Sequence, residues 1–167
     1  QAVSVDEDSS VDITLTASDP DGDNLSYTVT SGPSNGSLSG DAPNVSYSPN
    51  NNYNGDDSFT FSVSDGEYSD DAAVSITVNA VNDAPVLTDI GNQDTEEDTA
   101  LVLMLEAIDV ENSELTFTVE SDTTSIIISV DGNQLTMTPA TNWNGTANIT
   151  VTVSDLFLTD EETFVLT

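Results

Sequence analysis

The sequence has 167 residues but no lysine, arginine, histidine or cysteine. Its 31 aspartates and glutamates give a formal net charge of −31, and no salt bridge between side chains can form. The repulsion among these carboxylates can be relieved only by salt or by bound cations. The lack of basic residues also excludes the phosphate contacts of nucleic-acid binding and disfavours anionic membrane surfaces.

No hydrophobic run approaches the roughly 18 residues of a membrane-spanning helix, so we expect no direct membrane insertion. No signal peptide is present, and we expect any secretion signal or anchor to lie outside this stretch. The absence of cysteine leaves the redox compartment open. The wealth of Asn, Ser, Thr and Asp favours a secreted bacterial protein, and we predict an extracellular or cell-surface location.

An internal repeat organises the chain, because a shift of 90 residues aligns the sequence with itself without a gap. Matching segments include Glu7-Asp8 with Glu97-Asp98, Tyr53 with Trp143, and Val63-Ser64-Asp65 with Val153-Ser154-Asp155. We therefore predict repeat 1 at 1–80, a linker at 81–85 and repeat 2 at 86–167. We expect the whole to be a segment of a longer array.

Within each repeat, apolar and polar residues alternate, as Val11, Ile13 and Leu15 do with the polar residues between them. This period of two is typical of antiparallel strands with one solvated face. Turn sequences such as D-P-D-G-D and S-P-N-N-N-Y-N-G separate the strands, and no helical period competes. About seven short strands per repeat predict an all-β chain of two tandem seven-stranded Greek-key β-sandwiches, joined by a short acidic linker.

The first acidic turn reads Asp19-Pro20-Asp21-Gly22-Asp23. Hard cations such as Ca²⁺ take six to eight oxygen ligands, which alternating acids can supply, although Asp, Pro and Gly are also common turn formers. In a seven-stranded sandwich this turn shares an end with the Ser64-Asp65-Gly66 turn, so Asp19, Asp21 and Asp65 are expected to converge. Convergence without a basic side chain favours a bound cation.

The opposite end of repeat 1 collects a second acidic group with the linker. Its members are Glu7, Asp57, Asn82 and Asp83 from repeat 1 and the linker, and Asp109, Glu111 and Asp155 from repeat 2. These residues come from three segments that only a shared cation would hold together. A cation site also explains why the linker is polar rather than a flexible Gly/Ser stretch. We therefore predict Ca²⁺ at the junction of the repeats.

Catalysis has few candidate groups in this composition. Without His, Cys, Lys or Arg, only carboxylates and tyrosines remain for ordinary acid–base chemistry. A glycosidase with two carboxylates is the one option, but the acids lie at the ends of small sandwiches whose short loops leave no cleft. We predict that the protein is not an enzyme.

Several motifs together resemble one known family. They are the early E-D-S/T at 7–9 and 97–99, D-x-D-G-D-x-L-x-Y from Asp19 to Tyr27, Y-x-P-x-x-x-Y-N-G-x-D-S-F from Tyr47 to Phe59, S-D-G, and the closing V-N-D-A-P. With these motifs, both repeats resemble, almost end to end, the bacterial cadherin-like (tandem Ig-like/cadherin-like) repeats of large extracellular adhesin-type proteins.

The resemblance implies a calcium-dependent extracellular module. The ligands it implies are Glu7, Asn82, Asp83, Asp109, Glu111 and Asp155 at the junction, with Asp19, Asp21 and Asp65 at the other end of repeat 1. The L-D-R-E element of cadherins is absent, and Asp57 replaces it only in part. In repeat 2 the D-P-D-G-D turn has become Asp109-Val110-Glu111-Asn112-Ser113, so we expect fewer or weaker ions there.

The leading functional hypothesis is a calcium-rigidified structural or adhesive segment of a large surface protein, such as an adhesin stalk, surface fibre or filament. The alternative is a calcium-dependent carbohydrate- or protein-binding module. The expected partners are neighbouring repeats of the same array, with other cell-surface proteins or glycans as further candidates, and no nucleic acid.

Two features leave alternatives open. Tyr53 and Trp143 could stack on a sugar, but we favour the interpretation that each closes the end of its sandwich. Repeat 2 is also more apolar than repeat 1, and its additional apolar residues are Val102, Met104, Ile108, Ile126-Ile127-Ile128 and Leu156-Phe157-Leu158. They could form a protein contact patch, a thicker local core, or a strand of altered register.

Overall fold

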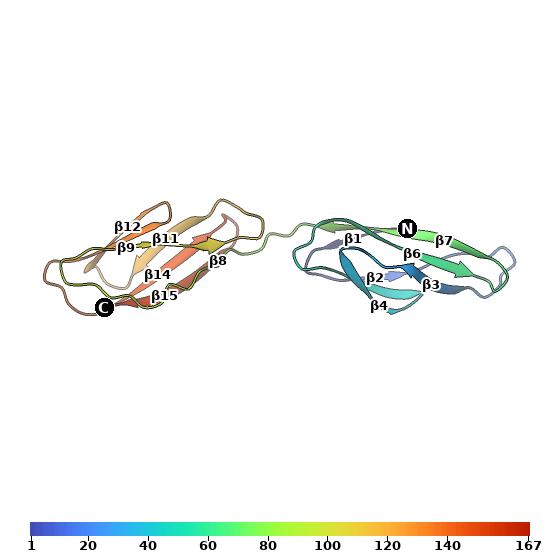
Figure 1. The fold of residues 1–167 in the computed structure, drawn as a ribbon, viewed down its shortest axis with the longest axis horizontal. Helices are drawn as coiled ribbons and strands as arrows, with labels where there is room; N and C mark the ends of the chain where they lie inside the picture. Colours follow the sequence, from blue (N-terminus) through green and yellow to red (C-terminus); the bar gives the residue numbers. More distant parts are fainter. The chain divides into compact units, whose positions relative to one another are not determined.

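The computed structural model describes all 167 residues, and every regular element in it is a β-strand. By their contacts the residues divide into two compact units, unit 1 at Gln1–Val81 and unit 2 at Asn82–Thr167. Figure 1 shows each unit as packed strands without helices, and no helix is present that could cross a membrane. The prediction of an all-β chain is confirmed.

Unit 1 contains seven strands in two sheets. They are β1 (Ala2–Asp6), β2 (Val11–Thr14), β3 (Ser26–Ser31), β4 (Gly36–Asp41), β5 (Asn44–Pro49), β6 (Gly55–Ser64) and β7 (Ser69–Asn79). One sheet has the order β1-β7-β6-β3 and the other β2-β5-β4. The first strand runs parallel to the last, with Val5 opposite Val78, and the other neighbours are antiparallel.

The core of unit 1 lies between these sheets and follows the alternation of the sequence. Along β7, Val74, Ile76 and Val78 are buried while the residues between them are exposed. From the other sheet, Ile13 and Tyr47 join the same buried cluster. Burying a side chain of this size stabilises the fold by about 1.5–3 kcal/mol, so the inward rows hold the sheets together.

Unit 2 has the same plan with more interrupted strands. They are β8 (Val86–Leu87), β9 (Leu101–Met104), β10 (Ala107–Ile108), β11 (Thr116–Ser121), β12 (Ile126–Asp131), β13 (Gln134–Pro139), β14 (Ala147–Ser154) and β15 (Thr159–Leu166). The sheet orders are β11-β14-β15, β12-β13-β9 and the short pair β10-β8. Where unit 1 has the parallel pair β1 and β7, unit 2 has a single parallel bridge between Gln93 and Leu166.

Acidic side chains of β15 hold the segment that runs from β8 towards this bridge. The backbone N–H of Leu87 donates to Asp160 Oδ2 at 2.9 Å, and that of Ile90 donates to Glu162 Oε2 at 3.0 Å. This part of the edge is therefore joined to β15 by side-chain carboxylates, and backbone hydrogen bonds to the end of the chain follow from Gln93 onwards.

The structure decides between the alternatives for the apolar residues of repeat 2. Along β12, Ile126 is 4% exposed, Ile127 is 64% exposed and Ile128 is half-buried, so the strand keeps the normal alternation. Val102 and Met104 on β9 are also exposed. Val102, Met104 and Ile127 therefore lie on the surface, whereas Ile126 belongs to the core and Ile128 packs against it. The regular alternation excludes an altered register along β12.

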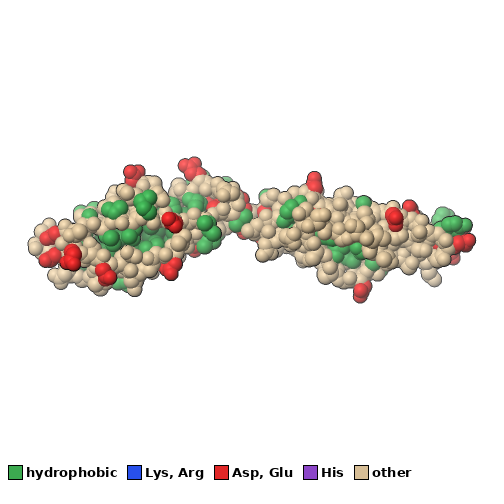
Figure 2. All heavy atoms as spheres, viewed as in Figure 1, with side chains coloured by type: hydrophobic (Ala, Val, Ile, Leu, Met, Phe, Trp, Pro, Cys, Tyr) green, Lys and Arg blue, Asp and Glu red, His purple; other side chains and the backbone are tan.

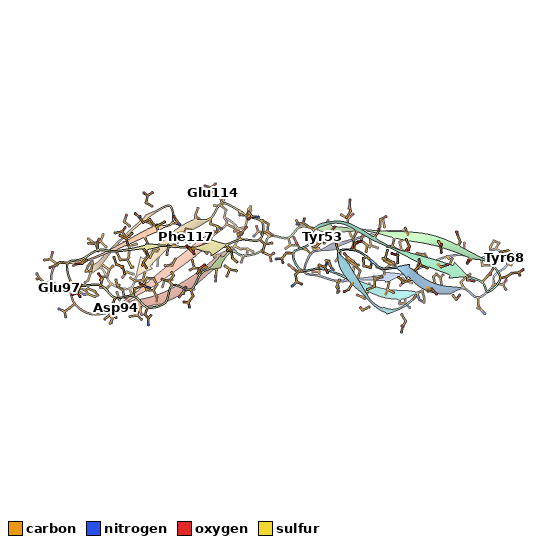
Figure 3. All side chains as sticks on the ribbon, viewed as in Figure 1. Tyr53, Tyr68, Asp94, Glu97, Glu114 and Phe117 are labelled. Carbon is orange, nitrogen blue, oxygen red and sulfur yellow. The ribbon has the colours of Figure 1, made fainter.

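The aromatic residues of the two Asn-Gly turns pack against their cores. Tyr53 lies at one end of unit 1 (Figure 3), is packed against the buried cluster and donates its hydroxyl to Asp56 O at 2.7 Å. Trp143 packs against the core of unit 2 in the same way. Both rings therefore close a sandwich end, as we favoured from the sequence.

Candidate cation sites

The acidic residues of unit 2 that were predicted at the junction come from two loops and from the segment that precedes β8. Asp109 and Glu111 follow β10, in a turn where Asn112 has a φ of 56°. Asp155 follows β14 and is only 3% exposed. Asn82 and Asp83 belong to the same compact unit. We call these five residues the unit 2 cluster.

Asp155 is the most buried acid of the unit 2 cluster, and every hydrogen bond it accepts comes from an amide. Its Oδ1 accepts the backbone N–H groups of Phe157 at 2.7 Å and Leu158 at 2.6 Å. Its Oδ2 accepts the side-chain amide of Asn82 at 2.6 Å. The N–H of Leu158 first, and then the Asn82 amide, hold the pKa of Asp155 below its usual range. In a chain without basic side chains, amide and hydroxyl groups are the side-chain and backbone donors that a carboxylate can find.

The linker residues are fixed to unit 2 by the same acids. The Asn82 amide nitrogen also donates to the Asp83 carbonyl at 3.0 Å. The backbone N–H of Asp83 donates to Glu111 Oε2 at 3.3 Å. Residues 82 and 83 are thus held through their polar groups, which accounts for the Asn-Asp sequence at this point.

Asp109 has one oxygen that no donor satisfies. Its Oδ1 accepts the backbone N–H of Ser113 at 2.8 Å, which shapes the turn. Its Oδ2 is buried and has no hydrogen-bond partner. A buried polar atom of this kind is uncommon in folded proteins, where most such atoms are paired.

Glu7 in unit 1 shows the same feature more strongly. It follows β1, is 2% exposed, and its Oε1 accepts the backbone N–H of Val81 at 2.8 Å. Its Oε2 is buried without a hydrogen-bond partner. Burying a carboxylate without a counter-charge is costly, so this site calls for a positively charged ligand.

Asp57 has a different environment from the one predicted for a metal ligand. Its Oδ1 accepts the N–H groups of Ser34 and Ser58 at 2.9 and 2.8 Å, and its Oδ2 accepts Asn35 N–H and the Tyr47 hydroxyl at 2.9 Å each. Burial alone would raise the pKa of Asp57, but these four donors together hold it below its usual range. The pKa of Tyr47 is raised, first by burial and then by this hydrogen bond. Asp57 therefore ties the β3–β4 turn to β5 and β6, a role that sequence reasoning missed.

At the other end of unit 1, the two predicted loops do meet. Asp19 and Asp65 both line a hollow of about 170 Å³. Asp19 Oδ1 accepts the N–H groups of Asp21 at 2.8 Å and Asp23 at 3.1 Å. Asp65 Oδ1 accepts the N–H of Tyr68 at 2.6 Å, and this bond is the main reason that the pKa of Asp65 is lowered. Asp21 does not line the hollow, whereas Asp70 of β7 does, so the acids that line it are Asp19, Asp65 and Asp70.

Nowhere in the structure do three or more acidic side chains converge closely enough to hold a metal ion by themselves. The available donors are nevertheless carboxylate, amide and carbonyl oxygens, which are the ligands that Ca²⁺ prefers. Glu7 and Asp109 each add a buried oxygen without a donor. The donor chemistry around the linker therefore fits a hard cation, with amide or backbone oxygens completing the coordination.

Two β-sandwiches in tandem with acidic loops at their ends define the chain as a pair of Ig-like domains. A profile of the bacterial Ig domain matches residues 1–77 and 82–167, and the chain belongs to this family. No curated protein sequence is significantly similar to it.

Among solved structures, the chain is similar to the EC1-2 domains of human protocadherin-24, with 14% identity over 99% of this chain and 92% of that one, and a TM-score of 0.60. It also matches Drosophila N-cadherin EC1-4, with 12% identity over 99% of this chain and 46% of that one, and a TM-score of 0.44. The predicted resemblance to cadherin-like and Ig-like tandem repeats is confirmed.

A third similarity is to an endo-fucoidan hydrolase of glycoside hydrolase family 107, with 27% identity and a TM-score of 0.43. The match covers 99% of this chain but only 27% of the hydrolase. The chain therefore spans about a quarter of the length of that relative.

Proposed function

We propose that the chain is a structural segment of a large extracellular surface protein, in which Ca²⁺ bound by the acids on each side of the linker stiffens the tandem repeats. The observation that carries this proposal is the pair of buried carboxylate oxygens, Glu7 Oε2 and Asp109 Oδ2, that have no donor. They occur in a chain that offers no basic side chain to either of them. The tandem Ig-like domains and their likeness to protocadherin domains support the same class of function.

Each side of the linker would contribute its own ligands. In unit 1, Glu7 supplies its free oxygen while its other oxygen holds the N–H of Val81. In unit 2 the carboxylates of the unit 2 cluster contribute, with the side-chain oxygen of Asn82 as a further ligand while its NH2 group keeps the hydrogen bond to Asp155. Asp57 is not included in the proposed ligand set, because four donors occupy its oxygens.

The stiffening follows from how the linker backbone is attached. Val81 is bound to Glu7 in unit 1, and the next residue, Asn82, is bound to Asp155 in unit 2. When the neighbouring carboxylates are not neutralised, their mutual repulsion weakens both attachments. Bound calcium supplies the missing positive charge, so Glu7 and Asp155 can hold both ends of this short segment and its rotation is restricted.

This function needs no catalytic group, and we propose that the segment is not an enzyme. A carbohydrate-binding role has little support from exposed aromatic rings, since Tyr68 and Phe157 are the only strongly exposed ones. The partners proposed for the linker sites are neighbouring Ig-like repeats.

Thermal unfolding with and without Ca²⁺ tests the specific sites. All four tyrosines lie in unit 1 and the only tryptophan lies in unit 2, so tyrosine circular dichroism and Trp143 fluorescence follow the two units separately. A ligand that binds only the folded state stabilises it by about 2.7 kcal/mol at a hundredfold excess over Kd, and we expect both signals to shift upwards. If chelator and saturating Ca²⁺ give the same melting curves at matched ionic strength, screening alone explains the effect and the proposal is wrong.

Small-angle scattering tests the linker itself. We expect Ca²⁺ to narrow the distribution of intramolecular distances, and chelator to broaden it. Asp83→Ala should behave like chelation in the presence of Ca²⁺ while both units stay folded. The matched control is Asp23→Ala, which changes an exposed acid far along the chain from the linker. Equal scattering from the two variants would show that the unit 2 cluster does not control the motion of the linker.

A further inference from the structure

Unit 2 exposes large apolar side chains on the β12-β13-β9 sheet and on the short β10-β8 pair that follows β9 along the chain. Val102 and Met104 on β9 are 50% and 58% exposed, Ile127 on β12 is 64% exposed, and Ile108 on β10 is 71% exposed. Val86, directly opposite Ile108 in the β10–β8 pair, is 54% exposed. We call these five residues the apolar face. Figure 2 shows hydrophobic side chains gathered on unit 2 in the region where Figure 1 labels β9 and β12.

The register of the sheet brings these residues together. Val102 pairs with Thr136 of β13, and Ile127 pairs with Thr138 of the same strand, so β13 carries threonine between the two apolar edges. Threonine methyl groups extend an apolar surface of this kind. Soluble monomers rarely expose large contiguous apolar patches, and those that they do expose are often interaction sites.

Repeat 1 provides an internal control for the meaning of this face. The positions that correspond to Val102, Met104, Ile108 and Ile127 are occupied in repeat 1 by Asp12, Thr14, Ser18 and Ser37. Unit 1 folds into the same sandwich with polar residues there. The fold therefore does not require these apolar side chains, and their presence in unit 2 needs another reason.

A hollow of about 350 Å³ adjoins the apolar face. Its lining includes Ile108 and the half-buried side chain of Phe117, which Figure 3 labels. In unit 1 the counterpart of Phe117 is Tyr27, whose hydroxyl accepts the N–H of Ala17 at 3.0 Å. Phe117 has no hydroxyl to make that bond, but Thr88, Glu106 and Asn133 also line the hollow, so the recess is only partly apolar. A partner's side chain could still be buried against Phe117.

Acidic residues border the apolar face. Asp131 pairs with Gln134, which pairs with Met104, so the three form one row across the sheet. Glu106 follows Met104 along the chain and is exposed. We propose that the apolar face binds a protein surface whose apolar side chains are bordered by lysine or arginine. Charge complementarity would steer and orient such a partner.

The same charges argue against the other occupants. A second copy of the chain would bring another −31 charges and no basic residue to the contact. An anionic membrane surface would repel the acidic border in the same way. A glycan usually stacks on exposed aromatic rings, and the apolar face contains none.

A defined probe tests the proposal on the full chain. The probe is a synthetic peptide with a leucine- and valine-rich segment flanked by lysines, titrated at physiological salt while methyl NMR signals are followed. Two control peptides replace the apolar segment by serine or the lysines by glutamate. We expect shifts at Val102, Met104, Ile108 and Ile127 with the probe, and at least about tenfold weaker binding of either control.

Residue exchange between the repeats supplies matched variants. The quadruple change Val102→Asp, Met104→Thr, Ile108→Ser and Ile127→Ser gives unit 2 the residues of unit 1, and should weaken probe binding about tenfold. The reverse graft of Asp12→Val, Thr14→Met, Ser18→Ile and Ser37→Ile should create a second site on unit 1. Trp143 fluorescence and tyrosine circular dichroism check that each unit stays folded.

Three results would overturn the proposal. Equal binding of the probe to the chain and to the quadruple variant would reveal general attraction to a polyanion. Dimerisation in sedimentation experiments that the quadruple change abolishes would identify a second copy as the occupant. Binding to zwitterionic lipid vesicles, lost in the same variant, would identify a membrane surface. None of these experiments requires Ca²⁺, so their outcome is separate from that of the linker sites.

Discussion

Unit 1 places Tyr47 and Asp57 where unit 2 places Met137 and Ala147. Tyr47 is fully buried, and its hydroxyl donates to Asp57, which also accepts three backbone N–H groups. Met137 and Ala147 are 0% and 1% exposed and contain no polar side-chain group. The same two positions of the sandwich therefore hold a hydrogen-bonded polar pair in unit 1 and an apolar pair in unit 2.

The comparison shows that the sandwich accepts a half-buried carboxylate beside a buried tyrosine when both carboxylate oxygens are hydrogen-bonded. In unit 1 the N–H groups of Ser34 and Asn35 rely on Asp57. In unit 2 the corresponding turn uses its own hydroxyl groups, since Ser125 N–H donates to Thr123 Oγ1 at 3.2 Å. Exchanging both residues of the pair should therefore cost less than exchanging one.

The largest effect is expected from Ala147→Asp, which places a carboxylate in unit 2 without the donors found in unit 1. An unpaired buried charge costs about 3–5 kcal/mol, and we expect a destabilisation of about 4 kcal/mol. Urea unfolding followed by Trp143 fluorescence measures it. Adding Met137→Tyr should recover part of the lost stability. An unchanged urea midpoint for Ala147→Asp alone would show that the site is more hydrated than its burial indicates.

Removing the Tyr47–Asp57 hydrogen bond from unit 1 should give the second-largest loss of stability. Asp57→Ala leaves the half-buried Asn35 N–H and the buried Tyr47 hydroxyl without their acceptor, and at about 1–3 kcal/mol for a buried unsatisfied group we expect a loss of about 2 kcal/mol. Tyrosine circular dichroism in urea follows unit 1. Tyr47→Met combined with Asp57→Ala should be about 1 kcal/mol more stable than the sum of the single changes predicts, and simple additivity would argue against coupling.

The β-hairpin turns offer a smaller contrast. Gly66 in unit 1 has a φ of 100°, and Leu156 at the same position in unit 2 has a φ of 87°, a region that disfavours a leucine. Gly66→Ala should destabilise unit 1 by about 1 kcal/mol, whereas Leu156→Gly should leave unit 2 as stable or raise its stability by up to about 1 kcal/mol. A clear destabilisation by Leu156→Gly would show that the exposed leucine makes a contact that compensates its backbone.

Low pH should lower the stability of unit 1 slightly more than that of unit 2, which is the smallest of the expected differences. Asp57 and Asp65 in unit 1, but only Asp155 in unit 2, have pKa values lowered in the folded state. Their stabilisation is present above the unfolded pKa of about 3.9 and is lost as the pH falls through the lower folded value. The melting temperature of unit 1 should therefore fall further than that of unit 2 below about pH 4, as read from the two spectroscopic signals. Equal falls of the two melting temperatures would mean that protonation of the many other carboxylates, rather than of these three, sets the loss of stability.

The sandwich fold could be predicted because its signal is local and repeated. Val74, Ile76 and Val78 alternate with polar residues in the sequence, and the structure buries all three. The outward position of Val102 and Met104 was predicted from the same alternation of inward and outward residues. Such predictions succeed because the period of a strand is fixed by backbone geometry.

The roles of individual acids could not be predicted in the same way. Asp57 stands beside Asp56 in a turn region and looks like a cation ligand, while its partner Tyr47 lies ten residues earlier. Only the packing of β5 against β6 brings the two together. One signal was available: both members of the pair change together in repeat 2, to Met137 and Ala147, as expected for residues in contact.

The parallel pairing of β1 with β7 has a consequence for a protein placed under tension. These strands begin and end unit 1 and are paired at five positions from Ala2 to Asp6. Pulling on the two ends loads all these positions in shear at once, so they must break together. A pull on these ends would therefore be resisted by the whole ladder, and unit 1 would keep its fold until the ladder ruptures.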